Sequence, residues 1–140
     1  MLKRISVLLS AVILMLSLFL LNRVPVFDMT KASNGYEVYL TSFSSEKSIA
    51  QVDENAFKFA LGVKGESICL DKNGFNLDEF LSQVGARLVF SEQLSSVTCY
   101  YAYSPKIKYQ KTLNGKRVNL QVVQKESFVK AGAPLIFGSF

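Results

Sequence analysis

Ser104 and two lysines that follow it, Lys106 and Lys108, come nearest to a catalytic arrangement in this sequence. Alternate residues of a strand point to one face, so a neutral lysine could activate the serine hydroxyl. Pro105 interrupts that geometry, and nothing in the sequence indicates a buried, neutral lysine. The chain has no histidine, which excludes serine–histidine–aspartate and cysteine–histidine catalysis. A small envelope hydrolase built on Ser104 is therefore a secondary hypothesis.

Carboxylate pairs offer a second route to hydrolysis. Sugar hydrolysis needs two acids that face each other across a cleft. The pairs Asp53–Glu54 and Asp78–Glu79 are adjacent in sequence, which is better explained by the exposed surface of a turn or helix. No glycine-rich loop that could cradle a phosphate is present. The sequence therefore predicts no catalytic residues, no cofactor and no metal site.

Cys69 and Cys99 are the only two cysteines. In an exported domain they could form a disulfide, because an even cysteine count and an oxidising compartment permit one. Two free thiols buried in strands are the alternative, and the sequence leaves both open. Two ligands without histidine do not complete a zinc site.

Tyrosines cluster beside basic residues near the C-terminal hairpin. Tyr100, Tyr101, Tyr103 and Tyr109 lie within ten residues. Exposed tyrosines next to lysines can stack on sugars or anchor a protein partner, although ordinary sheet packing also explains them. The predicted partner-binding face consists of Tyr101, Tyr103, Lys106, Lys108, Lys116 and Arg117.

The positive charge is uneven along the chain. The formal net charge is +5, and three of the basic residues are Lys3, Arg4 and Arg23. From residue 93 to residue 140 there are seven basic residues and one acid, Glu126. This distribution fits either opposite faces of one domain or a basic surface for anionic wall polymer, lipid headgroups or an acidic partner.

The N-terminal segment is the strongest indication of location. Residues 5–21 contain neither charge nor proline and directly follow Lys3 and Arg4. We predict a transmembrane signal-anchor with its N-terminus in the cytoplasm and the remaining chain outside. A signal peptide cleaved near Thr30–Lys31–Ala32, which would leave a secreted protein, is one alternative. A buried core helix is the other, although such helices are normally amphipathic.

The chain therefore divides into four predicted parts. They are a basic cytoplasmic stub at 1–4, the anchor at 5–21, a juxtamembrane linker at 22–35 and an extracytoplasmic domain at 36–140. This topology makes the chain a single-pass cell-membrane protein and excludes nucleic acid as a partner. The expected partners are the lipid bilayer, through residues 5–21, and an unknown envelope protein or anionic wall polymer.

Local signals predict an α+β domain with an antiparallel sheet and one or two short covering helices. Asn76 is a good N-cap and Gly85 a good terminator, so residues 77–84 should form a helix. Asn114–Gly115 predicts a type I′ hairpin in which Lys111 faces Val118. Continued along the chain, that register places Tyr109 opposite Leu120 and Ile107 opposite Val122. Further strands are expected at 36–41, 57–63, 86–90, 97–103 and 135–140.

Short motifs near the C-terminus resemble a known family. They are Tyr103–Ser104–Pro105, Asn114–Gly115–Lys116, Asn119–Leu120–Gln121–Val122 and Gly132-x-Pro134–Leu135–Ile136. Together they resemble the ending of the YwmB-like proteins, which are exported proteins of spore-forming Gram-positive bacteria. The resemblance implies a fold like that of the TATA-box-binding protein and no established activity. It implies neither DNA binding nor any catalytic residue.

The function expected from these observations is non-enzymatic binding or assembly at the cell surface by a membrane-anchored domain. The alternative is a binder of anionic cell-wall polymer or carbohydrate through the basic, tyrosine-rich hairpin face. The polymer-binding alternative would act through Lys106, Lys108, Lys116 and Arg117 and should weaken steeply as salt is raised.

Overall fold

The structure, a computed structural model, describes residues 1–21, 24–40 and 49–138. Within these ranges an antiparallel sheet of seven strands has the order β2-β1-β3-β9-β8-β5-β4, and β6 and β7 form a separate hairpin. This architecture confirms the predicted α+β class. The elements are α1 (Leu2–Leu21), η1 (Met29–Lys31), β1 (Tyr36–Tyr39), β2 (Ile49–Val52), α2 (Glu54–Phe59), β3 (Gly65–Asp71), α3 (Leu77–Gln83), β4 (Arg87–Leu94), β5 (Val97–Tyr103), β6 (Lys111–Leu113), β7 (Lys116–Val118), β8 (Leu120–Gln124) and β9 (Phe128–Ala133).

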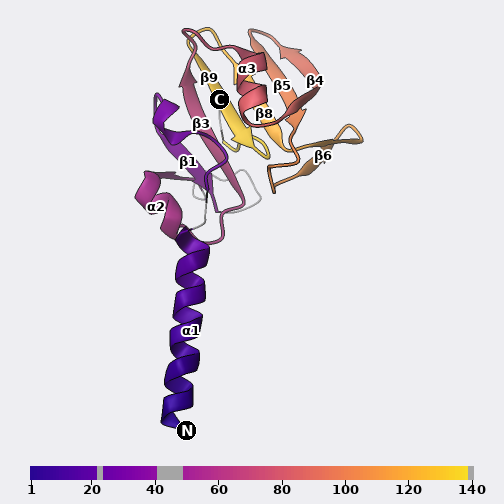
Figure 1. Cartoon of the computed structure of the whole chain (residues 1–140). Helices are drawn as coiled ribbons and strands as arrows, with labels where there is room; N and C mark the ends of the chain where they lie inside the picture. Colours follow the sequence, from indigo (N-terminus) through magenta and orange to yellow (C-terminus); the bar gives the residue numbers. More distant parts are fainter. Residues whose placement is uncertain (22–23, 41–48, 139–140) are drawn as a thin grey trace.

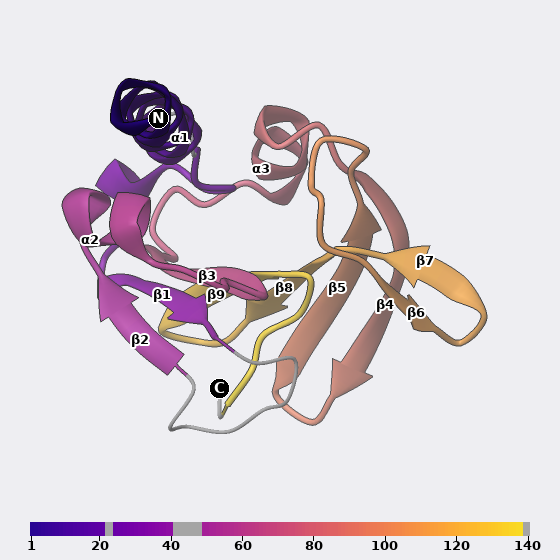
Figure 2. The same ribbon diagram turned by 90° about the horizontal axis from the view of Figure 1, so that it is seen from below.

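The two faces of the sheet are covered by different parts of the chain. Figure 2 shows α2 and α3 on one face and the segment after β9 on the other. Phe57 of α2 and Leu81 of α3 are buried in the core of the helical face, together with Phe27. The opposite face buries Ile136 against Tyr101 and neighbouring strand residues. Both cores therefore depend on segments outside the sheet.

The helix and the turn predicted from local signals are present. Asn76 caps α3, because its Oδ1 accepts a hydrogen bond of 3.1 Å from the backbone N–H of Glu79. Asn114 and Gly115 have φ angles of 50° and 72°, as a type I′ turn requires. In the hairpin Lys111 faces Val118, so the predicted register next to the turn is confirmed.

Further from the turn the predicted hairpin register is wrong. Val122 pairs with Tyr100 and Ala131 rather than with Ile107, and Leu120 pairs with Ala102. The change occurs at Asn119, whose backbone N–H bonds to Ala102 while its side chain binds the segment that follows β5. The chain therefore passes at Asn119 from the small hairpin into the large sheet.

Two predicted strands are wrong. Residues 54–59 form the helix α2, because Asp53 Oδ1 accepts the N–H of Ala56 and one helical face buries Phe57. At the C-terminus, β9 ends at Ala133, and the following segment docks without strand pairing. Its Ile136 N–H donates to Gln121 Oε1 at 2.9 Å. Residues 139 and 140 of the predicted strand 135–140 lie outside the described residues.

The N-terminal helix α1 projects away from the sheet beside α2 (Figure 1). Within the part of the chain that the structure describes, no helix has both the length and the apolar character needed to cross a membrane. The predicted transmembrane signal-anchor at 5–21 and the single-pass membrane localisation are therefore wrong. The alternative of a buried core helix also fails, since α1 side chains such as Leu8 and Phe19 are exposed.

Gly132 makes docking of the C-terminal segment testable. A Cβ atom at this position would lie 2.7 Å from Ile136 Cγ1 and 2.8 Å from the Ile136 backbone nitrogen. Gly132→Ala should therefore push this segment away from β9 and lower the free energy of unfolding by about 1–3 kcal/mol. Urea denaturation followed by circular dichroism measures the change. An unchanged midpoint would show that the segment does not pack on Gly132 in solution.

Candidate functional site

The structure divides the predicted partner-binding face into three parts. Tyr101 is buried, with its ring stacked on Phe90 at a centroid distance of 4.5 Å, so it cannot contact a partner. Lys106 and Lys108 belong to the segment between β5 and β6, and both line a cavity near α3. The remaining residues, Tyr103, Lys116 and Arg117, lie together on the β6–β7 side.

The Arg117 side chain makes more of the contacts described here than that of Lys116, the other basic residue of that group. Its Nη2 donates to Gln110 Oε1 at 2.7 Å and to the Tyr103 hydroxyl at 3.3 Å. The guanidinium also lies over the Tyr103 ring, 5.2 Å from its centroid. Because its orientation is already fixed, Arg117 would lose little side-chain entropy on binding an anion.

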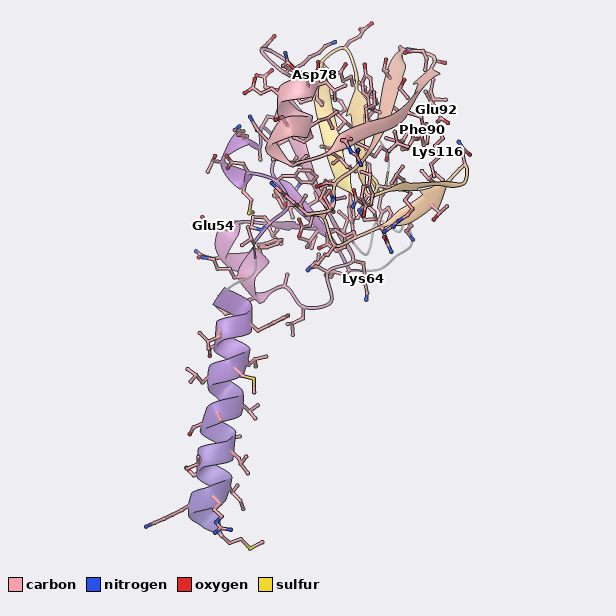
Figure 3. The ribbon with its side chains drawn as sticks, turned by 45° about the vertical axis from the view of Figure 1, so that its right-hand side comes forward. Glu54, Lys64, Asp78, Phe90, Glu92 and Lys116 are labelled. Carbon is pink, nitrogen blue, oxygen red and sulfur yellow. The ribbon has the colours of Figure 1, made fainter. Side chains whose placement is uncertain are left out.

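Lys116 and Arg87 extend this basic surface. The Lys116 amine lies 5.7 Å from the centroid of the Phe90 ring, and Figure 3 shows the two side chains next to each other. Arg87 is directly opposite Tyr103 in the pairing of β4 and β5, so the two side chains share a face. We call the set Arg87, Tyr103, Gln110, Lys116 and Arg117 the hairpin face.

The basic residues of the hairpin face carry no ion pair with any described acid. The salt bridges among described residues join Lys58 to Glu54 and Lys130 to Glu37. Lys116 and Arg117 are exposed. The hairpin face is therefore a basic surface without ion pairs among the described residues, and the acid Glu92 of β4 lies beside Phe90 and Lys116 at its border (Figure 3).

The structure gives Ser104 a different role from that of a nucleophile. Its side chain is buried, and its Oγ donates to the Val84 carbonyl at 2.7 Å and accepts the Lys106 backbone N–H at 3.2 Å. The exposed Lys106 side chain instead lies across Gly85, where an added Cβ would be 3.1 Å from the lysine Cδ. The serine hydroxyl and the lysine amine are not paired, so the Ser104 arrangement does not form the catalytic pair considered above.

The acidic pairs lie on helix surfaces. Asp53 caps α2 and Glu54 pairs with Lys58 at 3.6 Å, whereas Asp78 and Glu79 occupy the exposed first turn of α3. Figure 3 shows Glu54 and Asp78 at well-separated positions on the molecule. Within the described ranges no group of three or more acidic or cysteine residues is arranged to hold a metal ion.

The two cysteines lie in one row across the sheet. Cys69 faces Lys130, Lys130 faces Val123, and Val123 faces Cys99. Three strand spacings put the two Cα atoms about 14 Å apart, well beyond the roughly 7 Å limit for a disulfide. Both thiols are free, so of the two alternatives that the sequence leaves open this structure has the unbridged one.

Glu66 is a buried acid that sequence reasoning missed. Its Oε2 accepts the Val26 N–H at 2.7 Å and the Tyr36 hydroxyl at 2.9 Å, and its Oε1 accepts the Tyr109 hydroxyl at 3.1 Å. Burial raises the pKa of Glu66, and the same burial with the nearby carboxylate raises the pKa of Tyr36. The available signal was an acid near the start of a strand whose centre, Ile68–Leu70, is apolar. Glu66 joins the connector after α1 to the sheet.

Comparison with known proteins adds no homologue: no family model, no curated protein and no solved structure matches the chain. The resemblance to the YwmB-like proteins therefore stays a prediction. In the absence of a match, the fold and the surface described above define the class of protein. It is an α+β domain with a basic, aromatic hairpin face.

Proposed function

We propose that the chain is a non-catalytic binding domain whose hairpin face binds an anionic polymer. The observation that carries this proposal is the guanidinium of Arg117, which is held by Tyr103 and Gln110 and forms no ion pair with a described acid. Arg87 and Lys116 add two further charges on the same side. A polyanion contacts several such charges at once and releases its own counterions, which favours binding.

The surface is better suited to a polymer than to a folded protein partner. Tight protein interfaces depend on apolar or aromatic anchors that become fully desolvated. On the hairpin face the Tyr103 ring is already covered by Arg117, and the Phe90 ring is stacked on Tyr101 and capped by Lys116. The groups that remain exposed are charged, and charged groups can bind a flexible anionic chain without shape complementarity.

Dextran sulfate provides a direct test, because neutral dextran is its uncharged match. The full chain is expected to bind dextran sulfate and not dextran in a titration calorimetry experiment. The double variant Lys116→Gln/Arg117→Gln should weaken binding by about tenfold or more, since each lost contact of about 1 kcal/mol costs several-fold in affinity. Binding by the unmodified chain should also weaken steeply as salt is raised.

The matched control is Lys64→Gln/Lys72→Gln, which removes the same charge from exposed positions outside the hairpin face. Figure 3 shows Lys64 far from Lys116. The control should change affinity by less than about twofold. Equal losses in both double variants would mean that only net charge matters, and salt-insensitive binding would exclude the electrostatic mechanism.

A further inference from the structure

A second surface, separate from the hairpin face, lies where α1 meets the body of the protein. An open cavity of about 700 Å³ is formed there between the end of α1, the connector at Val24–Val26 and the segments at 61–63 and 106–108. Its volume is within the range of ligand sites in proteins. The cavity does not include Tyr103, Lys116 or Arg117.

Most of the cavity wall is apolar and open to solvent. Val24 is 79% exposed and Leu61 is 72% exposed, although both side chains are large hydrocarbons. Val26, Val63 and Ile107 continue the apolar wall. Covering such side chains with another hydrocarbon is favourable by about 25 cal/mol per Å². This wall therefore favours a ligand with an extended apolar part.

Positive charge lies beside the apolar wall. Lys106 and Lys108 both line the cavity, both are exposed, and neither forms an ion pair with a described acid. The Lys106 stem lies over Gly85, and the Lys108 amine lies 5.4 Å from the Tyr109 ring centroid. Lysines with apolar stems and free amines can place an anionic group at the border of an apolar surface.

Among the described residues Glu66 is the one acid that lines the cavity, and both of its carboxylate oxygens already accept hydrogen bonds. They accept hydrogen bonds from Val26, Tyr36 and Tyr109, all of which belong to the chain itself. Glu66 as a whole residue is 1% exposed. Glu66 therefore forms no ion pair with the two lysines at the rim and presents no free carboxylate to the cavity, although the charge of Lys108 acts on its carboxyl group to lower its pKa.

We propose that this cavity binds a single-chain amphiphile with an anionic head group, of which a long-chain carboxylate is the simplest example. The alkyl chain lies along Val24, Leu61 and Val63, and the head group pairs with Lys106 and Lys108. A phosphate-headed amphiphile shares this chemistry. Because the lysines border the apolar wall, we assign the cavity to a small amphiphile rather than to a second copy of the chain.

The exposed apolar side chains of α1 also attract alkyl chains, so the test must locate the ligand. The full chain, without detergent, is irradiated with a photoreactive long-chain fatty acid below its micelle concentration, and the labelled peptides are identified by mass spectrometry. Labels in segments 61–66 and 106–108 are expected. Labels confined to α1, or none at all, would overturn the proposal.

Two variants separate the contributions of the tail and the head group. Leu61→Asp should reduce labelling of the cavity by about fivefold or more, whereas Leu94→Asp, a similar change at an exposed position on β4, should leave it unchanged. In the double variant Lys106→Gln/Lys108→Gln, unlabelled laurate should compete about tenfold less well against the photoreactive probe. Competition by the monoglyceride of lauric acid, which has no charge, should not change. Equal competition by both compounds with the unmodified chain would remove the anionic head group from the proposal.

A phosphate-headed competitor, a lysophosphatidate of equal chain length, distinguishes the two head groups. Weaker competition by it than by laurate supports the carboxylate, and stronger competition reassigns the site to the phosphate within the same class. Loss of labelling on formation of a dimer, detected by light scattering, would show instead that a second copy covers the cavity. Failure of these experiments would leave dextran sulfate binding at the hairpin face unaffected, so the two proposals are tested separately.

Discussion

Replacing Asn119 by alanine is expected to lower the free energy of unfolding by about 3 kcal/mol or more. Asn119 is 1% exposed, and its side chain forms three hydrogen bonds. Its Oδ1 accepts the Ser104 N–H at 2.8 Å, and its Nδ2 donates to the carbonyls of Ser104 and Ile107 at 2.7 and 3.0 Å. Alanine would leave these buried backbone groups without their partner. Urea denaturation monitored by circular dichroism measures the loss.

The exposed Asn55 on α2 is the matched control for this substitution. Asn55→Ala removes the same atoms from a solvated position and should change stability by no more than about 0.5 kcal/mol. The contrary outcome is a loss of unfolding free energy at Asn119 as small as that at Asn55. It would mean that water can replace the Asn119 amide and that Asn119 does not hold the segment that carries Lys106.

Glu66→Ala is the second substitution with a large expected effect, again a loss of about 3 kcal/mol or more. The carboxylate accepts the N–H of Val26 and the hydroxyls of Tyr36 and Tyr109, which connect the segment after α1 to the sheet. Truncation would leave a buried amide and two phenols without this acceptor. Chemical denaturation at pH 7 gives the magnitude, with Glu126→Ala as the exposed acidic control.

Glu66 also predicts a pH dependence with a defined sign. Burial raises the pKa of Glu66 above its ordinary value of 4.5, so the folded state holds the proton more tightly than the unfolded state. The resulting stabilisation is complete below pH 4.5 and is lost as pH rises through the folded-state pKa. Each unit of the shift corresponds to about 1.4 kcal/mol.

The isosteric variant Glu66→Gln cannot ionise at this position and therefore isolates the titration. The stability of the original chain relative to Glu66→Gln should be greatest near pH 4 and should fall as pH rises above 4.5. Denaturant midpoints measured from pH 4 to pH 8 provide the comparison. A stability difference that is constant or that grows with pH would contradict a raised pKa for Glu66.

The features that sequence predicted correctly are those determined within a few residues. Asn76 and Gly85 delimit a helix because the cap bond and the positive φ are local properties. Asn114–Gly115 fixes a turn and its first pairs for the same reason. In each case the side chain and the backbone that it stabilises are neighbours in the sequence.

The failures concern contacts between distant residues. Phe57, Phe59 and Leu61 alternate as in a strand, yet only Phe57 is buried, because Asp53 starts a helix that turns the others to solvent. The hairpin prediction continued to Ile107 because nothing local shows that Asn119 binds the backbone of the segment after β5. Tyr101 is buried rather than exposed, because its ring stacks on Phe90 across the paired strands β4 and β5, and the residues around Tyr101 in the sequence do not reveal that pairing.

The candidate site shows the same limit. The charge of Lys116 and Arg117 and the turn beside them predict an exposed basic pair, and both residues are exposed. Arg87 and Gln110 join them only through the folded arrangement, since Arg87 lies opposite Tyr103 across two strands. Glu66 was missed because its three partners come from residues 26, 36 and 109.

The position of β9 has a consequence for how the protein is made. Among the described residues this strand follows all the others in sequence, yet it lies between β3 and β8 and joins the two halves of the large sheet. The ribosome must therefore release the residues as far as β9 before the halves can associate, and until then β3 and β8 each have an unpaired edge. Nascent chains at this stage would be vulnerable to exchanging β9 with one another, and a chaperone that shields strand edges would be most valuable there.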